Sequence, residues 1–275
     1  MTTDSRNIDH IAVAVRDLDA AATAYERLGF TLTPRAQHPW GTANRLIQLP
    51  GGNFIELLEI DRPGALPPHE PEAQPPHFSF GAFNRDYLAR REGMAMLVLA
   101  GQDSRADVER FRAAGLDTYA PFDFERSAPL PDGTMAKVAF SLAFASHPAT
   151  PLAGFFTCHS HYPENFWKPA YMQHANGAQE MVEVVLAAAE PAALSNFLTG
   201  FSGGAATPID GGIAIACATH RLTVLTPDAA RARYPDLDLD PALGPQFIAV
   251  VMTTNSSVPA ATDAGGVILE WRPAA

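Results

Sequence analysis

The stretch IDHIAVAVRDLDAAATAYERLGF, residues 8–30, decides the fold because its pattern is typical of a strand followed by a capped helix. Alternation at period two sends Ile11 and Val13 to one side of the strand and His10 to the other. Asp17 is a good N-cap, and the Leu-Gly-Phe ending is typical of a helix stop. The strand face turned away from the helix therefore carries a histidine between small residues, which leaves space in front of it.

The composition is that of a globular protein with enough chain for one large core or two ordinary ones. The 275 residues are 47% hydrophobic and 18% charged, and the formal net charge is −11. An acidic chain without basic patches argues against nucleic acid and membrane surfaces as partners. No apolar run is long enough for a membrane span, no signal peptide is visible, and two cysteines cannot make a disulfide framework. We expect a cytoplasmic protein that binds a small molecule; a homodimer is left open.

The first repeat unit continues after the helix with three strands. We predict a short strand over residues 31–35 and two longer ones over 45–49 and 53–60, joined by a Pro-Gly-Gly turn. Alternation in the last of these strands places Glu56 on the face opposite to Ile55 and Leu57. The proline-rich segment that follows, up to residue 77, is expected to be a linker.

The same pattern recurs along the chain, which indicates old duplications. A second unit has an apolar strand over 94–99, a helix ending at Ala-Gly-Leu (114–116), a turn at 131–133, and strands over 138–145 and 153–158. A third unit starts with a strand at 180–186, has a helix that opens at Glu190-Pro191, and has further strand over 213–225. A fourth unit lacks a clear helix and retains strands over 247–253 and 266–271.

Four segments resemble the vicinal oxygen chelate superfamily, which includes glyoxalase I, bleomycin resistance proteins and extradiol dioxygenases. These segments are DHIAVAVRDLDAAATAYERLGF, NFIELLE, RAQHPWGTANRLI and CHSHYPENFWKPAYMQHANGA, and the last two are similar to glyoxalase-like domain proteins. The resemblance covers residues 8 to about 203 well and the rest weakly. It implies an α+β fold in which repeated βαβββ modules pair into curved, cup-like mixed β-sheets with helices on the outside. We expect an N-terminal pair of modules (1–165), an aromatic-rich connector (166–178) and a degenerate C-terminal pair (179–275).

The resemblance also implies a divalent metal, held by the first and last strands of each module. His10 and Glu56 match the ligand positions of the first module, and their nitrogen and oxygen atoms suit Zn, Ni, Mn or Fe. The alternative is that His10 is a hydrogen-bonded core residue. The second module has no ligand at its opening strand, but its last strand supplies His159 and His161. The set of His10, Glu56 and His161 would be a two-histidine, one-carboxylate site. A cup that binds its ligand without metal is the alternative.

Other polar residues are candidates for substrate contacts, each with a structural alternative. The turn that holds His38, Thr42 and Asn44 can place ligand contacts at a strand mouth, or can simply satisfy its own backbone. Arg126 can clamp a carboxylate or phosphate, or can form an ordinary surface ion pair. The segment after the second module offers three more candidates, or else buries its rings as a linker: Trp167, His174 and Asn176.

The C-terminal pair of modules carries Glu180, Glu183 and Glu270 at matching strands but no histidine beside them. We expect these carboxylates to be structural or to form a cavity wall.

Two classes of function follow from the resemblance. The first is a metal-dependent lyase or isomerase of the glyoxalase type, in which the metal holds two vicinal oxygens and Glu56 serves as ligand and base. An extradiol-type dioxygenase with His38 or His161 as the base is a subordinate version. The second is a protein that sequesters a small molecule in the same cup without chemistry.

Overall fold

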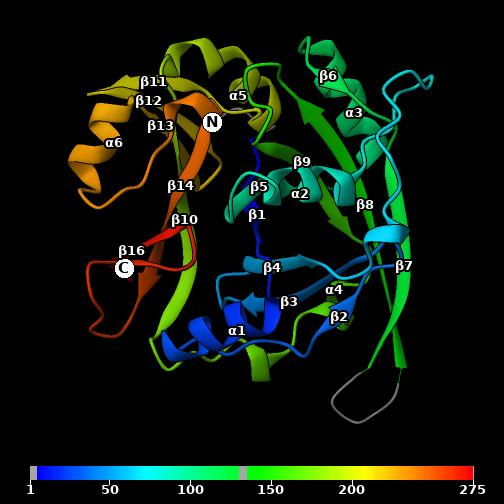
Figure 1. Cartoon of the computed structure of the whole chain (residues 1–275), viewed down its shortest axis with the longest axis horizontal. Coiled ribbons are helices and arrows are strands. Elements are labelled where there is room, and N and C mark those ends of the chain that lie inside the picture. The colour runs from blue at the N-terminus through cyan, green and yellow to red at the C-terminus, as the bar shows by residue number, and fades with distance from the viewer. Residues whose placement is uncertain (1–4, 130–134, 275) are drawn as a thin grey trace.

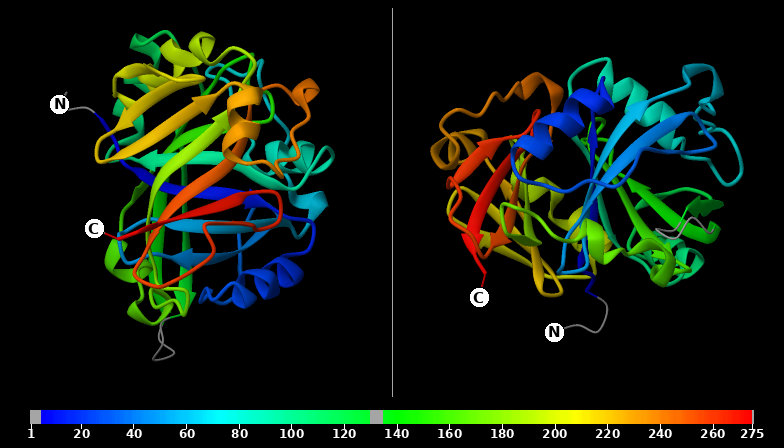
Figure 2. Two further views of the ribbon diagram at one scale, coloured as in Figure 1. Left: turned by 90° about the vertical axis from the view of Figure 1, so that its left-hand side faces the viewer. Right: turned by 90° about the horizontal axis from the view of Figure 1, so that it is seen from below.

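The chain folds into two curved mixed β-sheets, shown in a computed structural model that describes residues 5–129 and 135–274 (Figure 1). The first sheet is built by the N-terminal half and the second by the C-terminal half. The two halves lie side by side in Figure 1 and in the right-hand view of Figure 2. Among the described residues, no helix has the length and apolar character needed to cross a membrane.

The first module contributes one end of the N-terminal sheet. Its elements are β1 (Ile8–Ala14), α1 (Leu18–Arg27), β2 (Ala36–Gln37), β3 (Thr42–Gln48) and β4 (Phe54–Ile60). Asp17 caps α1 by accepting a hydrogen bond from the backbone N–H of Ala20. Strands β1 and β4 are parallel neighbours, with Ala12 opposite Glu56. The first and last strands of the module therefore lie against each other in the middle of the sheet.

The second module extends this sheet through β5, which pairs antiparallel with β1. Its elements are β5 (Gly93–Ala100), α3 (Ser104–Ala113), β6 (Asp117–Thr118), β7 (Phe122–Pro129), β8 (Met135–Ser146) and β9 (Gly154–Ser160). Strand β9 is parallel to β5, as β4 is to β1. The order of the described strands is β2-β3-β4-β1-β5-β9-β8-β6, and β7 pairs with β8. Short helices connect the elements: η1 (Pro63–Ala65), α2 (Phe80–Leu88), α4 (Pro163–Phe166) and η2 (Pro169–Tyr171).

The C-terminal sheet repeats the arrangement in a reduced form. Its strands are β10 (Ala178–Ala187), β11 (Ala206–Ile209), β12 (Gly212–Cys217), β13 (His220–Leu225), β14 (Gln246–Thr254), β15 (Ala261–Asp263) and β16 (Ile268–Pro273). Its helices are η3 (Pro191–Leu194), α5 (Ser195–Ser202), α6 (Pro227–Arg233) and η4 (Pro241–Leu243). Strand β10 is parallel to β13, β14 is parallel to β16, and β10 pairs antiparallel with β14. No helix separates β14 from β16 in this described stretch. The predicted class, α+β with paired βαβββ modules, is confirmed.

The main hydrophobic core joins the two sheets and separates the two faces of β1. Ile11 and Val13 are fully buried in this core together with Tyr25 of α1 and Val184 of β10. Ala12 and Ala14 belong to a second cluster on the opposite, concave face. Because side chains alternate along β1, one face of the strand packs in the core that joins the two halves, and the other face lines a cavity.

One local prediction needs correction, and two elements were not predicted. Residues 31–35 form no strand, because Pro34 has no N–H to donate and only Thr33 bonds to the Leu46 backbone. Helix α2, capped by Ser79, and strand β7 were not predicted, although Phe80, Phe83 and Tyr87 recur at helical spacing and Phe122 and Phe124 alternate as in a strand. The turn predicted at 131–133 lies outside the described residues.

Candidate functional site

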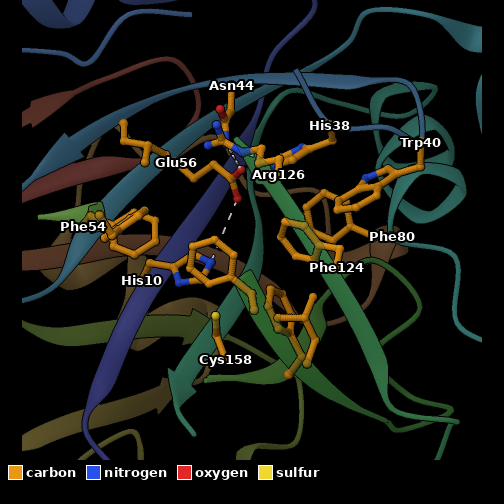
Figure 3. A pocket seen from close by; sticks show the side chains of 15 residues that line it. His10, His38, Trp40, Asn44, Phe54, Glu56, Phe80, Phe124, Arg126 and Cys158 are labelled. Carbon is orange, nitrogen blue, oxygen red and sulfur yellow. Dashed lines mark hydrogen bonds and ion pairs between the residues drawn. The ribbon is translucent and has the colours of Figure 1, made fainter. Parts of the chain in front are cut away.

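The concave face of the N-terminal sheet carries a cavity that is walled by aromatic rings (Figure 3). Strands β1, β3, β4, β7, β8 and β9 supply most of the wall, and Phe80 of α2 closes one side. The volume that the centres of water molecules can occupy is about 60 Å³. Since one water needs roughly 10–15 Å³ by this measure, the cavity has room for a small molecule. The lining side chains are His10, His38, Trp40, Asn44, Leu46, Phe54, Glu56, Phe80, Phe124, Arg126, Phe140, Leu142, Phe156, Cys158 and Phe166.

Glu56 is a buried carboxyl group in this cavity, with only 5% of its surface exposed. Asn44 donates a hydrogen bond of 2.6 Å from its side-chain amide to Oε1 of Glu56. Burial raises the pKa of Glu56, while His10, the Asn44 hydrogen bond and Arg126 lower it in part. The result is a carboxyl group that holds its proton more tightly than one in water, which is the property of a proton-transfer group.

His10 faces Glu56 from the neighbouring strand. Its Nδ1 lies 2.5 Å from Oδ1 of Asp9, and its Nε2 lies 4.0 Å from Oε2 of Glu56. A carboxylate can only accept, so Nδ1 carries a proton, and Nε2 is directed toward Glu56. The ring is stacked on Phe54 with a centroid distance of 4.2 Å. The gap between Nε2 and Oε2 is too long for a hydrogen bond and leaves room for a substrate atom.

His38 is held as a neutral imidazole behind Asn44. Its Nδ1 lies 2.8 Å from the Thr42 hydroxyl, and its Nε2 lies 3.4 Å from the Asn44 amide nitrogen. Burial, together with the charge of Arg126, lowers the pKa of His38 to about 3. The ring is stacked on Trp40. Thr42 does not line the cavity itself; it fixes His38, which in turn packs against the side chain that holds Glu56.

Three buried polar atoms of the lining have no hydrogen-bond partner among the described residues. They are Trp40 Nε1, Asn44 Oδ1 and Arg126 Nε. Arg126 lies on the same side of the cavity as Glu56, Asn44 and His38 (Figure 3). Buried polar atoms are normally paired, so three such atoms around one cavity indicate that a ligand completes them.

Cys158 also lines the cavity, at its floor, but as a thiol. Burial raises its pKa well above the ordinary value, and the charges of Asp9 and Glu56 add to this shift. A thiol that keeps its proton is a poor nucleophile. The side chain therefore acts as a small apolar part of the wall.

Besides Thr42, four residues that the sequence suggested for the site lie outside this cavity. His161 lines a separate, open pocket, where its Nε2 is 2.7 Å from the Ser141 hydroxyl. Trp167 packs against the rings of Phe54 and Phe166 behind the cavity wall.

The other two belong to the connection between the sheets. His174 accepts from the backbone N–H of Thr31 and contacts the Gln48 carbonyl oxygen at 2.9 Å. Asn176 bonds to the Leu28 carbonyl and to the Ala178 N–H. Their polar groups are already satisfied by the backbone, so these two side chains fix loops and do not face a ligand.

The predicted metal set of His10, Glu56 and His161 is corrected by this placement. Only His10 and Glu56 face each other, and no group of three or more His, Cys, Asp or Glu side chains with metal-site geometry occurs in residues 5–129 and 135–274. Strand β9 ends one residue before His161, whose side chain bonds to Ser141 and does not line the cavity. Mononuclear transition-metal sites use at least three protein ligands, so the residues present do not fit such a site.

Metal addition is therefore expected to leave the protein unchanged. After treatment with a chelator, one equivalent of Zn²⁺ should shift the melting temperature by less than about 2 °C, because a pair of ligands gains little binding free energy. The measurement is thermal unfolding with and without Zn²⁺, in wild type and in His10→Ala. A stable one-to-one complex that is lost in His10→Ala would show that a third ligand is recruited from elsewhere.

Sequence reasoning missed the aromatic wall and the partner of His10. Phe54, Phe140 and Phe156 lie on strands, and their positions at period two with known cavity residues could have indicated them. Trp40 follows His38 at the same spacing. Asp9 gave no signal, because neighbouring residues on a strand are expected to face opposite sides.

On the corresponding face of the C-terminal sheet, Ala230 of helix α6 packs with Tyr234 and Leu239 in an apolar cluster, and a group of charges lies beside it. Glu183, which is 1% exposed, lies 2.7 Å from Arg221, 3.0 Å from Arg233 and 3.2 Å from Arg272. Glu270 pairs with Arg233 and Arg272 and accepts from the Tyr234 hydroxyl. The third glutamate, Glu180, pairs with His220 at 2.8 Å. All three carboxylates are thus engaged in ion pairs, as expected for structural residues.

Paired βαβββ modules around one cavity define the vicinal oxygen chelate fold, and comparisons with known proteins agree. The family model described as "Glyoxalase-like domain" matches residues 8–201. The chain belongs to this glyoxalase-like family. No curated protein matches it.

Solved structures match over nearly the whole chain at low identity. A hypothetical protein from Staphylococcus aureus has a TM-score of 0.72 and 14% identity, over 98% of this chain and 100% of that one. A mutant of 4-hydroxymandelate synthase from Streptomyces coelicolor has a TM-score of 0.52 and 13% identity, over 91% and 72%. A fusion of a xylose isomerase-like TIM barrel with 4-hydroxyphenylpyruvate dioxygenase has a TM-score of 0.50 and 14% identity, over 91% and 37%. At these identities the matches show the fold alone.

Proposed function

We propose that the protein is an enzyme that moves a proton on a small oxygenated substrate bound in the N-terminal cavity. The observation that carries the proposal is the buried pair of Glu56 and His10, whose facing atoms are 4.0 Å apart. Glu56 has the raised pKa of a general base, and a carbon that lies next to a carbonyl group is the kind of acid that such a base can deprotonate.

Each polar residue of the cavity has a place in this reaction. Glu56 takes the proton from the carbon, and the electron pair moves to the neighbouring carbonyl oxygen to give an enediolate. His10 Nε2, oriented by Asp9, accepts the hydrogen bond of the vicinal hydroxyl group. Asn44 and His38 are positioning residues, since Asn44 holds Oε1 and leaves Oε2 for the substrate. The aromatic wall excludes water and strengthens these interactions.

The proposed reaction has no step through a bound metal ion, because residues 5–129 and 135–274 do not form a three-ligand site. This separates the proposal from the metal-chelating mechanism that the resemblance implies. The neighbouring 4-hydroxymandelate synthase and the dioxygenase fusion share the fold, but their names concern other reactions and are too distant to set the substrate. Sequestration of a ligand without chemistry is the second candidate, favoured by the apolar wall of the cavity.

Hydrogen exchange distinguishes the two candidates. In D₂O, wild-type protein should speed the loss of the CH₂ proton signal of 2-hydroxyacetophenone or hydroxyacetone, followed by proton NMR. The Glu125→Gln variant is a matched control, because Glu125 is exposed and pairs with Lys137 outside the cavity. Saturable binding of both compounds without faster exchange would contradict the enzyme proposal and support sequestration.

A further inference from the structure

We infer that the cavity selects a substrate with one carboxylate group on a flat apolar body, and that Arg126 recognises the carboxylate. This inference deepens the proposed function and rests on it in taking the same cavity as the substrate site.

Arg126 is a cation that makes no direct ion pair, and Glu56 is the carboxylate whose charge acts on it at longer range. Arg126 is half-buried on β7, inside the cavity, and forms no hydrogen bond or ion pair with the residues that the structure describes. Burial lowers the pKa of Arg126, which Glu56 offsets only in part. Other arginines of the N-terminal half differ: Arg105 is paired with Asp123, and Arg35 with Glu59 and Asp61. A desolvated guanidinium group without a partner is costly, and an anionic ligand removes that cost.

The neighbouring unpaired atoms favour a carboxylate over a larger anion. Arg126 Nε and Trp40 Nε1 are both donors, and both line the same cavity. A guanidinium group presents a planar fork that matches the two oxygens of a carboxylate. A phosphate dianion would need more positive charge than this single arginine, and it would lie close to Glu56. The cavity therefore fits one negative charge.

The aromatic wall of the cavity indicates the shape of the rest of the substrate. Phe54, Phe124, Phe140 and Phe156 contribute ring faces and edges to the cavity, and Trp40 is packed edge-on against Phe124 at 4.7 Å. Such rings favour a flat apolar group in offset or edge-to-face contact. Because the volume is small, this group is one ring or a short branched chain.

Benzoate and benzamide test the inference, since they have the same shape and differ in charge. Ligand-observed NMR titration of wild-type protein should give an affinity for benzoate at least about tenfold higher than for benzamide, as expected for a charge-assisted pair. Phenyl phosphate should bind more weakly than benzoate. In Arg126→Gln the preference for benzoate should disappear, and in Arg126→Lys it should return in part. Arg105→Gln is the matched control, because its charge is lost outside the cavity.

The inference is overturned if wild-type protein does not bind benzoate, binds benzamide equally well, or keeps its preference in Arg126→Gln. Circular dichroism shows whether the variants fold. The comparison of benzoate with benzamide in wild-type protein tests the inference even if a variant does not fold. The outcome is separate from that of the exchange experiment. An Arg126-dependent preference for benzoate without any hydrogen exchange leaves the inference intact and removes the proposed enzyme. Hydrogen exchange without a preference for benzoate removes the inference about Arg126 and leaves the proposed enzyme intact.

Discussion

The variant Glu56→Gln is expected to slow hydrogen exchange by about 10²–10⁴-fold, because a glutamine amide cannot accept the proton that a carboxylate base takes. The change keeps the shape of the side chain and its contact with Asn44, so ligand affinity should change little. A loss in the exchange rate at constant affinity is the signature of a catalytic base. The control Glu125→Gln should exchange at the wild-type rate.

The pH profile and the stability of the same variant add independent tests. The base must be ionised, so wild-type exchange should rise with pH through a midpoint above the ordinary carboxyl pKa of 4.5. A raised pKa in the folded state means that Glu56 favours folding below its unfolded pKa and loses this contribution as pH rises through the folded value. At neutral pH Glu56→Gln should therefore be as stable as wild type or more stable. A destabilised variant with a normal exchange rate would show that Glu56 is structural.

The variant Glu183→Gln is expected to lower the free energy of unfolding by about 2–3 kcal/mol at neutral pH, because Glu183 is the buried centre of an arginine cluster. The pairs with Arg221 and Arg233, and the hydrogen bond from Thr223, oppose the cost of burial and lower the pKa of Glu183 to about 2. Removing the charge leaves the arginines facing one another. Denaturant unfolding of the two proteins measures the loss directly.

The sign of the pH dependence follows from the same shift. A depressed folded pKa contributes stability above the unfolded pKa, and this contribution is lost as pH falls from about 4.5 toward about 2. Glu183→Gln should therefore show a flatter decline in stability over this range than wild type. The matched control is Glu180→Gln, whose carboxylate is partly exposed and should cost less than about 1 kcal/mol. Equal effects of the two variants would contradict the special role of Glu183. Exchange in the N-terminal cavity should not change in either.

The fold could be predicted from local patterns that repeat. In residues 8–30, alternation, the Asp17 cap and the glycine stop agree with each other, and they recur in the later modules. Such consistent local signals specify their elements without distant contacts. Where the signals were weak the prediction failed, as at Pro34, whose lack of an N–H ends a strand.

The sequence predicted only part of the candidate site. His10 and Glu56 each lie at period two on a predicted strand, and the parallel pairing of β1 with β4 brings them together. The orientation of His161 depends instead on how β9 ends and on its bond to Ser141, which is a contact between strands. No local pattern reports such contacts, so the three-ligand site could not be tested from the sequence.

By itself the sequence determined the modules, the core face of β1 and the face that carries His10, because these depend on periodicity within one segment. Tertiary structure alone decided what surrounds that histidine. It brought Arg126 from β7 to the side of Glu56 without a direct ion pair, and it closed the cavity with aromatic rings from distant strands. The physical reason is that burial and the pairing of charges depend on which strands become neighbours. Because their neighbours differ, Glu56 is a candidate base and Glu183 is a structural residue, although both are buried glutamates on strands.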